Sequence, residues 1–296
     1  MSALAFDRPP AESLGALLQA EMSEAAALAR DEAEAPDKRV HAARKQVKKL
    51  RAVLRLARPA LPRHAAADDA LRDAAAELSG LRDSHVYLKT LDWLQDRHPG
   101  RLAGPASVLR AHFTRTAPDS ATERDRLARF GDAITAIAAD SALWEMAPAG
   151  WTVLATGARK TYRRGRRALK TTRKTEGAAD FHNLRKQVKY RGNQMELLKD
   201  LPGLPTRTER EALFDLGEEL GRHHDLEALL LRTRQDAILN EEALAALSGA
   251  IERAQAKLGE RILAAAGPVY ARRPKRLRAL LRDSLKAAGG GQAGAR

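Results

Sequence analysis

The chain repeats a basic segment led by a histidine after 141 residues, and this repeat constrains the fold to two homologous halves. Residues 40–49 read VHAARKQVKK and residues 181–190 read FHNLRKQVKY. In both copies His, Arg, Lys and Lys stand at +0, +3, +4 and +7, a spacing that places them on one face of an α-helix. A second pair of landmarks, Asp83 and Asp225, lies 142 residues apart. Two landmarks with nearly the same offset indicate an internal duplication.

The apolar residues recur at helical spacing and runs of β-branched residues are nearly absent, which predicts an all-α fold. We expect helices over 11–34, 37–58, 64–82, 83–97, 105–117, 122–140, 151–175, 180–200, 207–222, 224–236, 240–266 and 274–287. Short connections between such helices favour bundles. The predicted architecture is two four-helix-bundle-like halves, 1–145 and 146–288, related by a pseudo-twofold axis and together forming one domain. Residues 289–296 are rich in glycine and are predicted to be a disordered tail.

The net charge of +14 is concentrated in three basic segments, 36–60, 159–191 and 268–286, while the rest of the chain is acidic overall. On a helical wheel the first repeat forms a cationic stripe opposite the apolar residues Val47, Leu50 and Leu54. The stripe consists of His41, Arg44, Lys45, Lys48, Lys49, Arg51 and Arg55. The second repeat supplies His182, Arg185, Lys186 and Lys189, but it places Arg191 where the first repeat has Leu50. We expect Arg191 to lie at the edge of the core and to pair with an acid.

Two further basic clusters extend this pattern. The helix expected over 151–175 carries Arg159, Lys160, Arg163, Arg166, Arg167 and Lys170 on one arc. A C-terminal cluster includes Arg273, Lys275 and Arg276. Like charges at i, i+4 destabilise a helix, and the stripes contain few acids that could offset the repulsion. The pattern therefore predicts binding of an anion with many charges.

The histidines and aspartates of the repeat are interpreted as supporting residues. Asp37 and Asp180 are predicted N-caps. His41 and His182 would then lie near helix starts, where the free N–H groups disfavour a cationic imidazole, so both are expected to be neutral. Asp83 and Asp225 are expected to follow helix breaks and to hold Arg and Lys side chains in position.

Several classes of protein are disfavoured by what the sequence lacks. It contains no cysteine, no apolar N-terminal signal segment and no stretch long enough to cross a membrane, so a cytoplasmic protein with no membrane partner is expected. No glycine-rich phosphate loop, activated nucleophile or paired carboxylate constellation is evident. We therefore predict a binding protein rather than an enzyme, with no cofactor and no metal.

The paired His-x-x-Arg-Lys-x-x-Lys helices and the matching Arg82-Asp83 and His224-Asp225 elements resemble the CHAD family, the conserved histidine α-helical domain. The basic segment 159–167 is also similar to that family's opening helix of the second half. The resemblance covers residues from about 10 to 287 and implies a stand-alone domain, because the segment before it is too short for the triphosphate tunnel domain of many relatives. Departures from the family pattern occur at His85 and at residues 191–193.

The resemblance implies that inorganic polyphosphate is the partner, bound in a basic groove between the two helical halves, with targeting to polyphosphate granules. It places the stripe residues of both repeats at that site. Nucleic acid bound without sequence preference is the second candidate partner, although aromatic residues for base stacking are scarce. The third candidate is a metal-dependent phosphohydrolase built on His182, His223, His224, Asp225 and Asp236. The oligomeric state stays open.

Overall fold

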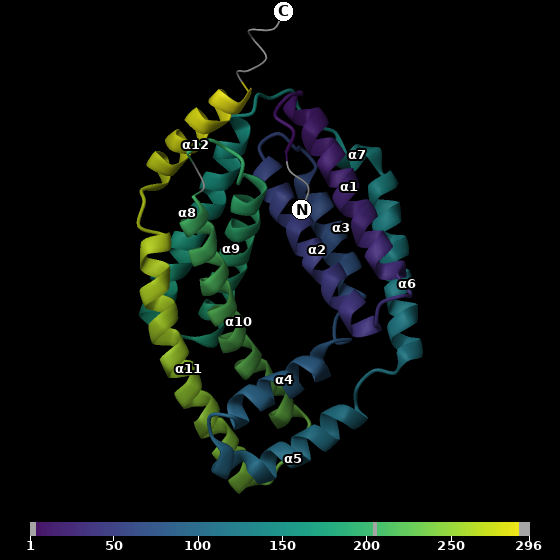
Figure 1. Ribbon diagram of the computed structural model, residues 1–296, viewed down its shortest axis with the longest axis vertical. Coiled ribbons are helices and arrows are strands. Elements are labelled where there is room, and N and C mark those ends of the chain that lie inside the picture. The colour runs from purple at the N-terminus through teal and green to yellow at the C-terminus, as the bar shows by residue number, and fades with distance from the viewer. Residues whose placement is uncertain (1–3, 204–205, 290–296) are drawn as a thin grey trace, which may run out of the picture.

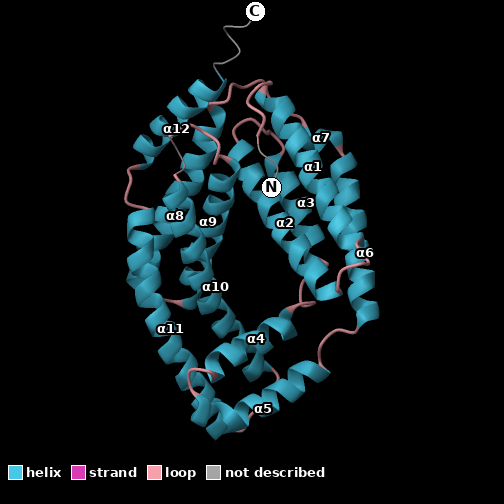
Figure 2. Ribbon diagram, in the orientation of Figure 1, coloured by secondary structure: helices cyan, strands magenta, loops and turns pink. Residues whose placement is uncertain are grey.

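The computed structural model describes residues 4–203 and 206–289, and within these ranges it contains twelve helices and no strand (Figures 1 and 2). The helices are α1 (Pro10–Arg30), α2 (Pro36–Ala57), α3 (His64–Ala76), α4 (Asp83–Gln95), α5 (Pro99–Arg115), α6 (Ser120–Ala139), α7 (Ser141–Trp144), α8 (Val153–Thr175), α9 (Ala178–Leu197), α10 (Arg207–Gln235), α11 (Glu241–Val269) and α12 (Pro274–Gly289). The predicted all-α fold is confirmed.

Local sequence signals explain where many of these helices begin. Prolines occupy the first position of four helices, including Pro36 in α2 and Pro99 in α5, where the missing N–H costs no helical hydrogen bond. Helix α10 begins with a capping box, in which the Thr206 hydroxyl accepts from the Glu209 amide and the Glu209 carboxylate accepts from the Thr206 amide. The start positions predicted from such breaks are therefore mostly close to those observed.

Several boundary predictions are wrong. The helix predicted over 105–117 begins six residues earlier, at Pro99. The predicted break near residue 223 does not exist, because α10 runs without interruption from Arg207 to Gln235. In the first half the helix predicted over 64–82 ends earlier, at Ala76, and Gly80 takes a positive φ of 79° in the connection to α4. Gly289 ends α12 rather than belonging to a tail. The rest of the predicted tail, residues 290–296, lies outside the described residues.

The helices pack in three groups (Figure 1). Helices α1, α2, α3 and α6 form a four-helix bundle in the first half, and α8 to α11 form the main body of the second half with α12 against α8. Helices α4 and α5 leave the first half and pack against α10 and α11. The first half is therefore not a self-contained bundle, because its central hairpin completes a third group with the second half.

The order of the helices repeats with the spacing of the sequence motifs. Helices α2 and α9 begin at residues 36 and 178, α3 and α10 at 64 and 207, and α5 and α11 at 99 and 241. Helix α10 thus spans the part of the second half that corresponds to α3, the connection and α4 in the first. This order is compatible with the pseudo-twofold relation, which stays a prediction.

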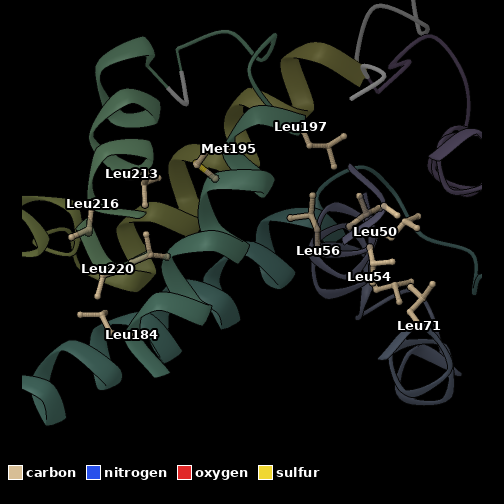
Figure 3. Close-up of a cluster of buried hydrophobic side chains, with 14 of the residues drawn as sticks. Leu50, Leu54, Leu56, Leu71, Leu184, Met195, Leu197, Leu213, Leu216 and Leu220 are labelled. Atoms are coloured by element: carbon tan, nitrogen blue, oxygen red, sulfur yellow. The ribbon is translucent and has the colours of Figure 1, made fainter. Parts of the chain in front are cut away.

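Leucine-rich cores fill the bundles, as the cluster in Figure 3 shows. Leu50 and Leu54 of α2 lie near Leu71 of α3, whereas Leu184 of α9 lies near Leu220 of α10. The apolar side of each repeat helix is therefore buried, as its periodicity predicts, and the opposite side is left for charged residues. Among the described residues no helix has the length and apolar character needed to span a membrane.

One close helix crossing joins the two halves. Helix α8 packs against α2 through Gly157, where an added Cβ would lie 2.0 Å from the Leu56 carbonyl oxygen. Only glycine permits this approach, because any side chain would collide with the backbone of α2. The crossing brings the basic face of α8 next to the C-terminal end of α2.

Candidate functional site

The cationic side chains of both repeats meet where α2, α9, α10 and the start of α4 come together. We call Arg44 and Lys48 of α2, Arg82 before α4, and Arg185 and Lys189 of α9 the inner cluster. The pKa of Lys48 is lowered to about 8, first by its withdrawal from bulk water and then by the positive charges of the other four members. Its side chain is nevertheless exposed. The ammonium group therefore reaches solvent while the surrounding chain and cations disfavour its charged form.

Two arginines of the inner cluster are held in position. Arg44 donates from Nη1 to the carbonyl oxygen of Leu78, at a distance of 2.8 Å, and so attaches α2 to the connection between α3 and α4. Burial lowers the pKa of Arg44, with Asp83 opposing the shift and Arg82 and Arg185 adding to it. The Nε of Arg185 is buried without a hydrogen-bond partner among the described residues. The Arg185 side chain as a whole is partly exposed beside Lys48.

Three carboxylates neighbour the five cations of the inner cluster. Glu218 of α10 accepts a hydrogen bond of 2.9 Å from Lys189 Nζ. Asp225 of α10 lies among Arg185, Arg82 and Lys48. Burial raises its pKa, although the positive charges of these three side chains act to lower it. Asp83 exerts its charge on Arg44. The carboxylates leave the cluster with an excess of positive charge. Glu218 positions Lys189, whereas the positioning role of Asp83 and Asp225 stays a prediction, because neither forms an ion pair with a described residue. Asp225 lies within a continuous helix rather than after a break.

The histidines border the inner cluster and favour the neutral form. His182 Nδ1 lies 3.3 Å from His224 Nδ1, so one of the two rings must carry its proton on this nitrogen. The pKa of His224 is lowered to about 4 by burial and then by Arg185. Burial, followed by nearby cations, also lowers the pKa values of His41 and His182. The predicted neutral state is supported on these grounds.

The structural reason for neutral histidines differs from the predicted one. The N-cap residues are Ala35 and Gly177, not Asp37 and Asp180. Asp37 lies in the first turn of α2, and the Asp180 carboxylate accepts a hydrogen bond of 2.5 Å from the Thr175 hydroxyl. Both histidines follow the first helical turn, so desolvation and neighbouring cations, rather than a free helix end, disfavour the charged form.

The C-terminal part of the α2 stripe is partly neutralised by one carboxylate from another helix. The helical wheel of α2 alone could not reveal it. Asp68 of α3 accepts from Arg51 at 2.8 Å and from Arg55 at 2.7 Å, with side chains about one-fifth exposed. Arg55 also stacks on the ring of Tyr190, 3.9 Å from its centroid. The repulsion within this part of the stripe is therefore offset by an acid from another helix, because α3 packs against this face of α2.

The remaining members of the two repeat stripes face different surroundings. Lys49 donates from Nζ to Gln46 at 2.9 Å, and Gln46 in turn donates to Glu21 of α1. Lys49 is thus directed toward the first bundle rather than the inner cluster. Lys45 and Lys186 are exposed to solvent.

A second basic region, the outer cluster, lies where α8 crosses the end of α2. It comprises Arg58, His64, Lys160, Arg164 and Arg167. Burial lowers the pKa of Arg164, and Arg58, Arg55 and Arg167 lower it further. The pKa of His64 is lowered by burial and by Arg58, and Lys160 contributes to the shift. Through Arg51 and Arg55 the α2 stripe connects the inner cluster to the outer cluster.

The other predicted basic residues lie on α8 or near the beginning of α12, which packs against it. Arg166 donates from Nη1 to the Arg272 carbonyl oxygen at 2.7 Å, and the Nε of Arg159 is buried without a partner in the described part of the chain. Arg163 and Lys170 of α8 are exposed. Near the beginning of α12, which packs against α8, the exposed residues are Arg273, Lys275 and Arg276.

Arg191 is buried without the predicted acid. It is 4 % exposed, and its guanidinium lies 4.4 Å from the ring centroid of Tyr162 and 5.8 Å from that of Tyr270. No ion pair of Arg191 occurs within the described residues. The tyrosine faces compensate part of its charge, which sequence periodicity alone could not show.

Sequence reasoning missed Arg58, Arg82, Lys89 and Arg164 as site residues. Arg82 was visible only as a neighbour of the Asp83 landmark, and Lys89 lowers the pKa of His41 from α4. None of these residues belongs to a repeated stripe. For Arg82 the sequence contains one signal, the match between the two halves. Arg82 precedes Asp83 in the first half, as His224 precedes Asp225 in the second.

The residues of the metal-site candidate are not gathered at one point. Asp236 accepts from His112 Nε2 and from Arg232 Nε, each at 2.8 Å. His223 instead stacks on Phe181, with ring centroids 4.2 Å apart. Over residues 4–203 and 206–289, no group of three or more His, Cys, Asp or Glu side chains is placed to hold a metal ion.

Comparisons with known proteins agree with this architecture. The chain is similar in structure to PptA from Streptomyces chartreusis, with a TM-score of 0.60 and 18 % identity, over 90 % of this chain and 100 % of that chain. It is also similar to the CHAD domain from the plant Ricinus communis, with a TM-score of 0.57 and 20 % identity, over 97 % of this chain and 94 % of that chain.

The sequence comparisons give one match that assigns a family. No curated protein matches the sequence. The family model of the CHAD domain matches residues 13–234, which is three quarters of the chain. With its helical fold and its paired basic helices in place, the chain belongs to the CHAD domain family.

Proposed function

We propose that the protein binds inorganic polyphosphate and that the polyanion lies across the inner cluster. The observation that carries this proposal is the environment of Lys48, which is desolvated and surrounded by four cations from three elements of the chain. Gathering like charges in a desolvated site costs free energy, and a polyanion offsets that cost through charge-assisted hydrogen bonds. The partly exposed Arg185 can supply such bonds beside Lys48.

The α2 stripe gives the ligand a path between the two clusters. From His41 to Arg58 the helix advances about 25 Å at 1.5 Å per residue. A long polyphosphate can contact the inner cluster and continue past Arg55 to Lys160, Arg164 and Arg167 of α8. Orthophosphate can occupy only one position along this path. We therefore expect tight binding of long chains and weak binding of orthophosphate.

The test compares polyphosphate affinities of the wild type and two matched double variants. Lys48→Gln/Arg185→Gln removes two inner-cluster charges. Arg124→Gln/Lys286→Gln removes one Arg and one Lys that are exposed and form no ion pair with any described residue. Each charge-assisted contact contributes about 1.5–3 kcal/mol before losses, so the inner-cluster variant should bind about 100-fold more weakly. Equal affinity of both variants and the wild type would remove the proposed site.

Nucleic acid is tested as a competitor in the same titration. Tyr190 lies against the α2 stripe, and Arg55 already covers its ring, which leaves it poorly suited to stack on a base. Short polyphosphate should displace DNA completely, while DNA should fail to displace polyphosphate. The reverse order of displacement would favour nucleic acid as the partner.

The proposed activity is binding rather than catalysis, in a cytoplasmic protein that associates with polyphosphate granules. The basic residues supply charge and hydrogen-bond donors, and the histidines beside them are held neutral by burial and cations. In cells that form granules, a fluorescent fusion of the wild type should co-localise with them. The Lys48→Gln/Arg185→Gln fusion should become diffuse, whereas granule association of that variant would argue for another anchor.

A further inference from the structure

A basic cavity that shares no lining residue with the inner cluster lies where the C-terminal end of α4 meets α10 and α11. Its volume is about 350 Å³. It is lined by Trp93, Arg97, His98, Arg222, Arg253, Ala254, Lys257, Leu258 and Arg261. Cavities of a few hundred Å³ are of the size that holds small-molecule ligands.

The charge of this cavity is strongly positive. Arg253, Lys257 and Arg261 stand at i, i+4 and i+8 on one side of α11, a spacing at which like charges repel. Glu219 of α10 pairs with Arg261 at 2.8 Å and more distantly with Arg222 at 3.4 Å. Arg253 and Lys257 form no ion pair with any residue that the structure describes. One carboxylate thus faces five cationic side chains.

The cavity combines these charges with an apolar wall. The Arg97 guanidinium lies 3.9 Å from the ring centroid of Trp93 and donates to the Trp93 carbonyl oxygen at 3.0 Å. Ala254 and Leu258 lie on the α11 side. Arg97 is therefore held in place by its stacking, which reduces the entropy it would lose when it binds an anion.

The cavity and the inner cluster lie on neighbouring sides of α10. Glu218 pairs with Lys189 of the inner cluster, whereas the adjacent Glu219 pairs with Arg261 of the cavity. Consecutive residues of a helix point about 100° apart, but Arg222 of the cavity lies one turn after Glu218 and helps to lower the pKa of that carboxylate, so the two sites adjoin across α10. A ligand in the cavity does not need to touch the α2 stripe.

We propose that this cavity binds a compact small molecule that carries a triphosphate group. Arginine forks match phosphate oxygens in a bidentate manner, and five cations suit a ligand with several negative charges. The cavity's limited volume favours a short phosphate chain over a long polymer. The triphosphate can come from inorganic tripolyphosphate or from a nucleoside triphosphate. The proposal does not depend on the function of the inner cluster.

The test uses calorimetric titration of the full chain with tripolyphosphate and, separately, with ATP, both without added metal. The background is Lys48→Gln/Arg185→Gln, which weakens the inner cluster. In this background we expect one bound equivalent of at least one of the two ligands. Adding Arg253→Gln/Lys257→Gln should weaken that binding at least tenfold. Adding Arg124→Gln/Lys286→Gln, the matched control, should leave it within twofold.

The outcomes distinguish tripolyphosphate from ATP as the ligand, and the cavity from the inner cluster as the binding site. Similar affinities for tripolyphosphate and ATP indicate that the phosphate chain alone is recognised, whereas tighter binding of ATP indicates a nucleotide site. A thermal unfolding transition like that of the wild type shows that the variants are folded. Failure of both ligands to bind the background variant, or equal binding after Arg253→Gln/Lys257→Gln, overturns the proposal. Either result leaves the polyphosphate affinity of the wild type unaffected.

Discussion

Lys48 is the residue at which the electrostatics of the two halves converge. Its own helix contributes Arg44, α9 contributes Arg185 and Lys189, and the segment before α4 contributes Arg82, and all four lower its pKa. The side chain is therefore partly deprotonated just above neutral pH, unlike an ordinary lysine. A phosphate group nearby would reverse this shift, because an opposite charge favours the protonated form.

This residue predicts a pH dependence of binding. In the free protein Lys48 loses its proton near pH 8, and the bound polyanion requires the charged form. Above pH 8 binding must therefore take up a proton, and affinity should fall by up to about tenfold per pH unit. Titrations at pH 7 and 9 should show this fall in the wild type and a smaller one in Lys48→Arg. Equal falls in both proteins would assign the effect to another group.

Asp68 gives a prediction about stability. Its pKa is lowered by hydrogen bonds from Arg51 and Arg55 despite the opposing effect of burial, so the ionised form stabilises the fold above the ordinary aspartate pKa. This contribution is lost as pH falls through the lowered pKa. Asp68→Asn should reduce the free energy of unfolding by about 1–2 kcal/mol at pH 7, and the difference from wild type should nearly vanish near pH 2.

The control for Asp68 is its exposed neighbour Asp69, which pairs with Arg72 on the surface. Asp69→Asn should change stability by less than about 0.5 kcal/mol. Urea unfolding of both variants at both pH values makes the comparison. A loss in Asp68→Asn that is as large at pH 2 as at pH 7 would show that packing, not charge, is responsible.

At the scale of elements, the site depends on how α2 is crossed by its neighbours. Helix α3 supplies the acid for Arg51 and Arg55, α8 brings the outer cluster to the end of α2, and α9 supplies the facing half of the inner cluster. The bend between α3 and α4 brings Arg82 and Lys89 close to α2. Helix α10 remains straight at the corresponding position, so the two halves contribute to the site differently.

The close α2–α8 crossing predicts that adding one methyl group at Gly157 greatly reduces the free energy of unfolding. Gly157→Ala would place Cβ 2.0 Å from the Leu56 carbonyl oxygen, so the helices must separate, at a cost of about 3 kcal/mol. The matched control is Gly192→Ala in α9, where no atom lies within 4 Å of the added Cβ. This variant should be stabilised by up to about 1 kcal/mol through helix propensity. Thermal unfolding of both tests the crossing, and similar transitions would contradict it.

The sequence predicts the faces of helices better than it predicts what packs against them. Periodicity and prolines indicate the all-α fold and most helix starts, and the duplicated stripe directs attention to Arg44, Lys48 and Arg185, which lie together in the structure. The sequence could not show that Asp68 neutralises Arg55, because that pairing joins two helices. Nor could it show that Arg191 is buried against tyrosines from two other parts of the chain. These contacts depend on crossing geometry, which one helical wheel does not contain.

At the scale of the whole molecule, the proposed site extends along α2 from the inner cluster to the outer cluster. Polyphosphate affinity should therefore increase with chain length until the chain spans about 25 Å, the distance along the helix axis from His41 to Arg58. For longer chains, the affinity of each bound protein molecule should change little. Competition titrations with a series of defined chain lengths measure this. A plateau already reached by tripolyphosphate would indicate that the outer cluster takes no part.

The most direct test of the account is the salt dependence of long-chain polyphosphate binding. Each lost phosphate contact should reduce the slope of log K against log salt concentration by about 0.7, the value for single-stranded polyanions. Lys48→Gln/Arg185→Gln should therefore reduce the slope by about 1.4, while Arg124→Gln/Lys286→Gln should leave it unchanged. An unchanged slope in the first variant, or equal reductions in both, would contradict the claim that the polyanion lies across the inner cluster.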